Sequence, residues 1–169
     1  MSDTEGGASE LYEYAKSALT ALALAVVASR SRVSIFWVLS GFFAFATLDN
    51  WVGLHESFFD FTTMSGFEGE LAYFGLTTLI FIALFYAFWP AGRQAGRIEA
   101  TQIVMAIVFT AFCAVVIDAA HSIIGMLFGR LQNVLGYLED GGEMVGLSIS
   151  LALAVAMVVA GQLHRPQDN

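Results

Sequence analysis

The sequence predicts an all-α integral membrane protein, built as a bundle of four to five transmembrane helices. Of its 169 residues, 57% are hydrophobic, and the mean hydropathy is +0.71. Charged residues make up 13%, about half the ~25% share that is usual in a soluble domain. The hydrophobic residues also form long runs without any charge: Val33–Thr47, Leu71–Trp89, Ile103–Ile117 and Met144–Gly161. With neutral neighbours, each run approaches the ~20 residues that cross a ~30 Å hydrocarbon core.

The runs divide the chain into five segments within a single membrane domain, residues 1–169. We expect them at about 9–29, 33–57, 69–89, 99–128 and 139–163. The first segment has two interpretations, because its fully apolar part, Ala18–Ala28, is short. It either spans the membrane or lies in the interface as an amphipathic helix. We predict that it spans, since Arg30–Arg32 then makes a tight turn into the second segment. Pro90 ends the third segment, and Pro166 closes the fifth.

Charge predicts the orientation and excludes one class of partner. A net charge of −8 and a pI near 4.6 argue against nucleic-acid binding, because no basic stripe exists to contact phosphates. If the segments alternate in direction, most arginines fall on one side: Arg30, Arg32, Arg93, Arg97 and Arg165. The other side holds only Arg130, beside many acids. The positive-inside rule therefore predicts a multi-pass protein of the cell (inner or plasma) membrane, with its C-terminus in the cytoplasm.

Acidic and histidine residues occur in three segments where a membrane helix is normally apolar. Counted from the Arg-rich ends at about 1.5 Å per residue, they lie about 24–36 Å along their segments, in the outer third of the membrane. Charges at such depths are costly and are often functional. Spacing also places several of them on shared helix faces. The candidate ligands of a metal site near the exocytoplasmic face are Asp49, His55, Glu56, Asp118, His121, Glu139 and Glu143.

Carboxylates with two histidines suit one or two divalent metal ions, for which we expect iron, manganese or zinc. Asp118-x-x-His121 resembles, in residue type, the acid-x-x-His ligand pair of ferritin-like proteins. It uses Asp where that pair has Glu, and the sequence holds no second such pair, so we interpret the likeness as a shared design rather than family membership. Gly142 and Gly146 would let a neighbouring helix approach the face of Glu139 and Glu143 closely.

Simpler interpretations compete with the metal site. Asp140 and Glu143 have the spacing of a capping box at the start of the fifth segment. His55 and Glu56 could be wetted residues at a helix end, and Asp118 with His121 could form a structural pair. We expect Glu13, with Glu10, to belong to a solvated tail, although both would reach the polar layer if the first segment spans.

Three functions fit these features. The first is a membrane metalloenzyme, an oxidase, hydroxylase or hydrolase that acts on a lipid-like substrate at the metal site. The second is a non-catalytic small subunit of a larger membrane complex, with partner subunits or a homo-oligomer around it. The third is a component of a proton or ion pathway, against which stands the lack of charged residues in the inner half of the segments.

Overall fold

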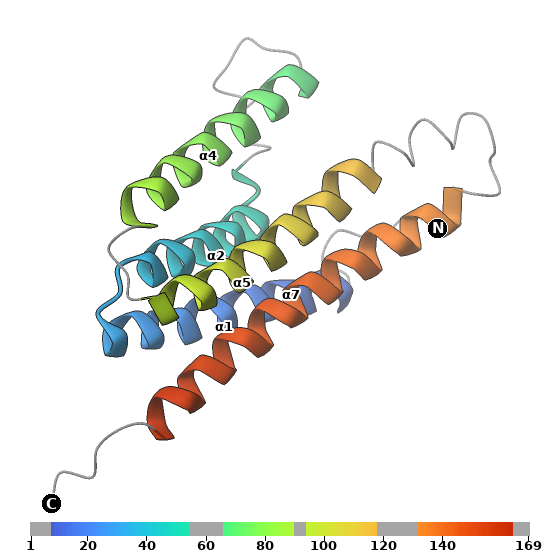
Figure 1. The fold of residues 1–169 in the computed structure, drawn as a ribbon. Helices are drawn as coiled ribbons and strands as arrows, with labels where there is room; N and C mark the ends of the chain where they lie inside the picture. Colours follow the sequence, from blue (N-terminus) through green and yellow to red (C-terminus); the bar gives the residue numbers. More distant parts are fainter. Residues whose placement is uncertain (1–7, 55–65, 90–93, 118–131, 164–169) are drawn as a thin grey trace, which may run out of the picture.

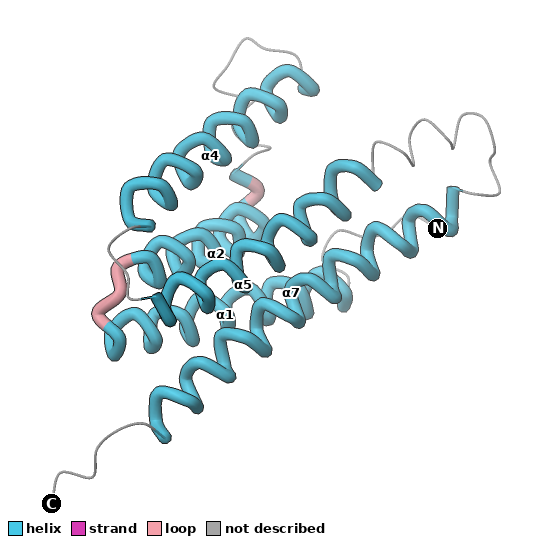
Figure 2. Tube along the Cα trace, viewed as in Figure 1, coloured by secondary structure: helices cyan, strands magenta, loops and turns pink. Residues whose placement is uncertain are grey.

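The computed structural model describes residues 8–54, 66–89, 94–117 and 132–163. Within these ranges the chain is helical, and a short turn joins the first two helices (Figure 2). The elements are α1 (Ala8–Ser31), α2 (Ile35–Val52), α4 (Gly66–Phe88), α5 (Gln94–Phe112) with its π-helical continuation η2 (Cys113–Ile117), and α7 (Gln132–Leu163). The described residues contain no strand, so the all-α prediction is confirmed for this part of the chain.

Two residues with left-handed backbone explain where α1 and α2 end. Arg32 has φ 56°, and its N–H donates to the Ala28 carbonyl at 3.1 Å, which turns the chain directly into α2. Gly53 has φ 65° and ψ 44°, and its N–H donates to the Asp49 carbonyl at 2.8 Å. Glycine adopts this conformation without a Cβ clash, so α2 closes at Val52 and not at residue 57 as predicted.

Successive helices alternate in direction (Figure 1), and α1 has two main helix neighbours. It packs against α2 on one side and α7 on the other, while α5 packs mainly along α7. Helix α4 stands apart from this group and contacts α2 (Figure 1). The core lies where α1, α2, α5 and α7 meet, and its most buried side chains include Leu24, Phe36, Leu39, Ile103 and Ala154.

Small polar side chains bridge α1 and α2. Ser17 Oγ donates to the Phe43 carbonyl at 3.2 Å, and Ser40 Oγ donates to the Ala21 carbonyl at 2.8 Å. Both serines are buried, so these bonds satisfy hydroxyl groups that would otherwise be costly among apolar neighbours. Hydroxyl-to-carbonyl bonds of this kind are a common means of joining helices in an apolar solvent.

The predicted close approach at Gly142 and Gly146 is confirmed, and α5 with η2 is the neighbouring helix. A Cβ atom at Gly142 would overlap Cys113 Sγ, and one at Gly146 would overlap Thr110 Oγ1. Other atoms are also close, since the same Cβ positions lie 2.9 Å from Cys113 Cβ and 3.1 Å from Thr110 Cβ. Helix α7 therefore meets α5 along a surface where only glycine fits.

Three helices in the described part of the chain are long and apolar enough to cross a membrane. The spans are Leu11–Ser31, Ile35–Val52 and Val134–Gly161, and α4 adds a shorter apolar stretch, Ala72–Phe88. The first of these is the segment with two interpretations, and its central packing between α2 and α7 is that of a bundle helix. By length and composition the described residues thus support three of the four to five predicted crossings.

Candidate functional site

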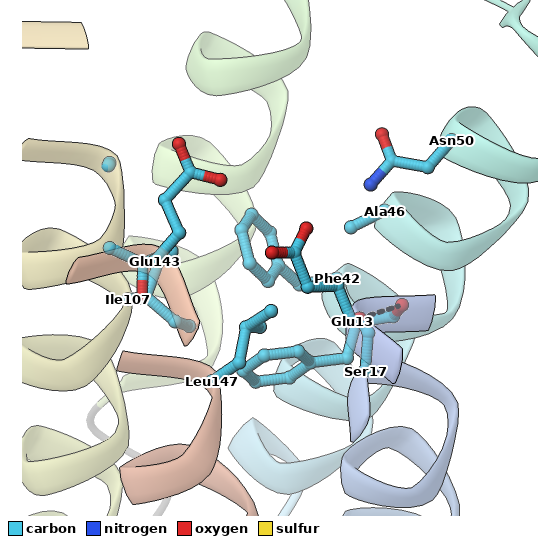
Figure 3. A pocket seen from close by; sticks show the side chains of 11 residues that line it. Glu13, Ser17, Phe42, Ala46, Asn50, Ile107, Glu143 and Leu147 are labelled. Atoms are coloured by element: carbon cyan, nitrogen blue, oxygen red, sulfur yellow. Dashed lines mark hydrogen bonds between the residues drawn. The ribbon is translucent and has the colours of Figure 1, made fainter. Parts of the chain in front are cut away.

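A cavity of about 200 Å³ lies among α1, α2, α5 and α7. Its lining combines hydroxyl, amide and carboxyl groups with aromatic and aliphatic side chains: Glu13, Ser17, Phe42, Phe43, Ala46, Asn50, Ile107, Thr110, Ala111, Glu143 and Leu147 (Figure 3). A water molecule needs about 10–15 Å³ of such volume, so the cavity has room for several waters or a hydrated ion.

Three long polar side chains reach the cavity from three helices. Figure 3 shows Glu13 on α1, Asn50 on α2 and Glu143 on α7 extending toward the same space, with Leu147 beneath them. Glu13 is near the start of α1, Asn50 near the end of α2, and Glu143 in the first half of α7. Because successive helices alternate in direction, these positions all fall at one end of the bundle (Figure 1).

The hydroxyl groups of the cavity present oxygen lone pairs. Ser17 gives its proton to the Phe43 carbonyl at 3.2 Å, and Thr110 gives its proton to the Ala106 carbonyl at 3.0 Å. Each hydroxyl oxygen can then still accept a hydrogen bond or coordinate a cation. The lining residues include no histidine and no cysteine, so the described wall offers oxygen ligands together with the Asn50 amide.

The only lysine of the sequence, Lys16, lies at the α1–α7 contact beside this site. It is 7% exposed, and its Nζ donates to the Met144 carbonyl at 3.2 Å. The ammonium also lies over the Tyr12 ring, 4.2 Å from its centroid. Glu13 precedes Lys16 by one helical turn, and Met144 follows Glu143 directly, so this cation is next to both acidic positions of the cavity.

Asp49, the first of the predicted metal ligands, is outside the cavity lining and joins α2 to α4. Its side chain is 5% exposed, and its Oδ1 accepts a hydrogen bond from Tyr73 Oη at 2.7 Å. Phe45, one turn before Asp49, stacks on the Tyr73 ring with centroids 6.4 Å apart. Phe81 extends the same contact along α4. The neighbour of Asp49 in sequence, Asn50, is the α2 residue that lines the cavity.

The other predicted ligands divide into two groups. Glu143 lines the cavity. Four candidates lie outside the described residues: His55, Glu56, Asp118 and His121. The backbone of Glu139 belongs to α7, but its side chain also lies outside the described part of the structure. Within the described ranges, no group of three or more His, Cys, Asp and Glu side chains is placed to hold a metal ion. The full carboxylate and histidine site therefore stays a prediction.

Two expectations from the sequence are wrong. Helix α7 begins at Gln132, well before the predicted start at Glu139, so Asp140 and Glu143 lie inside a continuous helix and cannot form its capping box. Glu13 belongs to α1 and lines the cavity, so it is not part of a solvated tail. One sequence feature indicates that Glu13 belongs to the first helix. Glu13, Ser17 and Thr20 follow helical spacing and form a polar stripe on an otherwise apolar helix.

Comparison with known proteins supplies one finding. A protein family described as Domain of unknown function (DUF8692) matches residues 8–159, which span α1 to most of α7. No curated protein and no solved structure matches the chain.

Proposed function

Because the chain belongs to the DUF8692 family, whose description carries no activity, we propose a function from its own cavity: it is an integral membrane protein that binds a divalent cation between α1, α2, α5 and α7. The observation that carries this proposal is that Glu13 and Glu143, far apart in sequence, line one cavity together with Asn50.

The surface of the bundle supports a membrane location. Large apolar side chains are exposed on every described helix, among them Leu22, Leu79, Met105 and Val145. A soluble protein rarely exposes apolar area on this scale, whereas lipid covers it at no cost. Trp37 near the start of α2 is 54% exposed and Trp51 near its end is 70% exposed. Tryptophans at both ends of a crossing helix are typical of the two membrane interfaces.

Charge supports one orientation in that membrane. Arg30, Arg32 and Arg97 are exposed at the end of the bundle where α1 ends and α5 begins. Glu13 and Glu143 lie toward the opposite end. The positive-inside rule then assigns the arginine end and the end of α7 to the cytoplasm, and the cavity to the exocytoplasmic half.

The chemistry of the lining favours a hard cation. Carboxylate, amide and hydroxyl oxygens are the ligands that Mg²⁺, Ca²⁺ and Mn²⁺ prefer, whereas zinc favours nitrogen and sulfur. Among the metals predicted from the sequence, manganese fits the described lining best. A divalent ion held there would polarise a bound water or the oxygen of a substrate. The candidate ligands outside the described residues, Asp118 and His121 among them, belong to the same proposal.

Titration of the detergent-purified protein with Mn²⁺, followed by calorimetry, tests this function. We expect about one ion per chain, and Glu143→Gln should weaken binding by about 10–100-fold or more because it removes a charged ligand. Asp140→Asn is the matched control, since Asp140 is an exposed acid one turn earlier on α7. Glu13→Gln should behave as Glu143→Gln does. Equal binding by Glu143→Gln and Asp140→Asn would show that the cavity is not the cation site.

A further inference from the structure

Lys16 is a buried cation at the α1–α7 contact, one helical turn after Glu13 of the cavity lining. Burying an ammonium is expensive, and such a group is retained only where other groups compensate its charge. Its direct contacts, the Met144 carbonyl at 3.2 Å and the Tyr12 ring at 4.2 Å, are both uncharged. They fix the position of the ammonium, while its full charge has to be balanced by acids nearby.

Both acids of the cavity occupy positions adjacent to Lys16 or to its hydrogen-bond partner Met144. Glu13 is three residues before Lys16, which puts their Cβ atoms about 5–6 Å apart on the surface of α1. Glu143 is adjacent to Met144, whose carbonyl holds the ammonium. The ammonium of Lys16 is therefore anchored beside the helix positions of both acids, and its charge is opposite to theirs.

We propose that Lys16 is a built-in counter-charge that sets the cation affinity of the cavity. This inference rests on the proposed function and adds its regulation by charge. When the cavity is empty, the ammonium neutralises part of the carboxylate charge. When a cation enters, the ammonium repels it, so the ion binds more weakly than two carboxylates alone would allow and can leave again.

Coulomb's law gives this proposal a distinctive signature. A fixed positive charge repels a divalent ion twice as strongly as a monovalent ion at the same position. Neutralising Lys16 should therefore tighten Mn²⁺ binding by the square of the factor by which it tightens Na⁺ binding. A change that merely loosened the α1–α7 contact would not depend on the charge of the ligand in this way.

Three substitutions separate the charge of Lys16 from its hydrogen bond. Lys16→Gln keeps a donor for the Met144 carbonyl but has no charge, Lys16→Arg keeps the charge, and Lys16→Met keeps neither. Calorimetric titration with Mn²⁺ at two NaCl concentrations measures the affinity for Mn²⁺ and, by competition, for Na⁺. Lys16→Gln still carries the test if the Met variant does not fold.

We expect Lys16→Gln to bind Mn²⁺ about tenfold tighter or more than the wild type, and Na⁺ about threefold tighter. Lys16→Arg, which keeps the charge, should bind both ions as the wild type does. Suppose that the wild type binds Mn²⁺ and that Glu143→Gln weakens this binding. Unchanged or weaker Mn²⁺ binding by Lys16→Gln would then overturn the counter-charge inference and leave the proposed function standing. Failure of the wild type itself to bind Mn²⁺ overturns the proposed function, and the counter-charge with it.

Discussion

Replacing Gly146 by alanine tests the packing of α5 against α7, on which one wall of the cavity depends. The added methyl group would overlap Thr110 Oγ1 and lie 3.1 Å from Thr110 Cβ and 3.3 Å from Phe109 Cδ1. Thr110 cannot turn away freely, because its hydroxyl is bonded to the Ala106 carbonyl at 3.0 Å. We therefore expect α5 to be pushed away from α7, at a cost of about 2–3 kcal/mol, toward the upper end of the range for overpacked interiors.

Helix propensity acts in the opposite direction and has to be removed from the comparison. Alanine in place of glycine within a helix is favourable by about 1 kcal/mol. Gly141→Ala is the matched control, because Gly141 is on the same helix and a Cβ there meets nothing within 4 Å. The propensity gain is common to both variants, so the difference between them isolates the packing cost of about 2–3 kcal/mol.

Thermal unfolding in detergent measures this difference, with the single cysteine as the reporter. Cys113 is buried on the same face of the α5–η2 helix as Thr110, so a fluorogenic maleimide reacts with it only when the helices separate. In a protein of this size, 1 kcal/mol corresponds to about 2–4 °C, which places Gly146→Ala about 4–12 °C below Gly141→Ala. Thr110→Ala should restore part of the loss in the double variant. Equal melting temperatures for Gly146→Ala and Gly141→Ala would refute the close contact.

Two further predictions concern the ends of α2. Tyr73→Phe removes the hydrogen bond to the buried Asp49 carboxylate and should lower the free energy of unfolding by about 1.5–3 kcal/mol, measured by the same thermal assay. Tyr86→Phe, at an 84% exposed position of the same helix, should change it by less than about 0.5 kcal/mol, and an equal effect of the two would count against the Tyr73 contact. Arg32→Gly should raise the melting temperature, since it relieves a left-handed backbone that disfavours side chains by about 1–2 kcal/mol. Arg30→Gly, two residues earlier inside α1, should lower it, and a loss in both would show that the turn does not need the left-handed residue.

Much of the helical framework could be predicted from the sequence because the information is local. Long uncharged runs are stable as helices in an apolar solvent, where every backbone group must be bonded within its own segment. A tight turn between the first two helices and the approach surface at Gly142 and Gly146 could be predicted for the same reason, since each depends on a few adjacent residues and on helical spacing. The turn itself begins at Arg32, because Arg30 and Ser31 still belong to α1. The start of α7 could not, because the residues from Gln132 to Glu139 carry no strong apolar run to identify them as helical.

The composition of the site was decided by tertiary structure. Glu13 reads as part of a polar tail in the sequence, and it lines a cavity only because α1 packs between α2 and α7. Asp49 is a conspicuous acid in an apolar run, yet its partner Tyr73 comes from a helix that the sequence does not connect with it. Hydropathy and spacing determined that this chain forms apolar helices with acids toward one end, since these depend on short-range free energies. Which acids share a cavity depends on how helix faces pair over long distances in the chain, and only the packed bundle decides that.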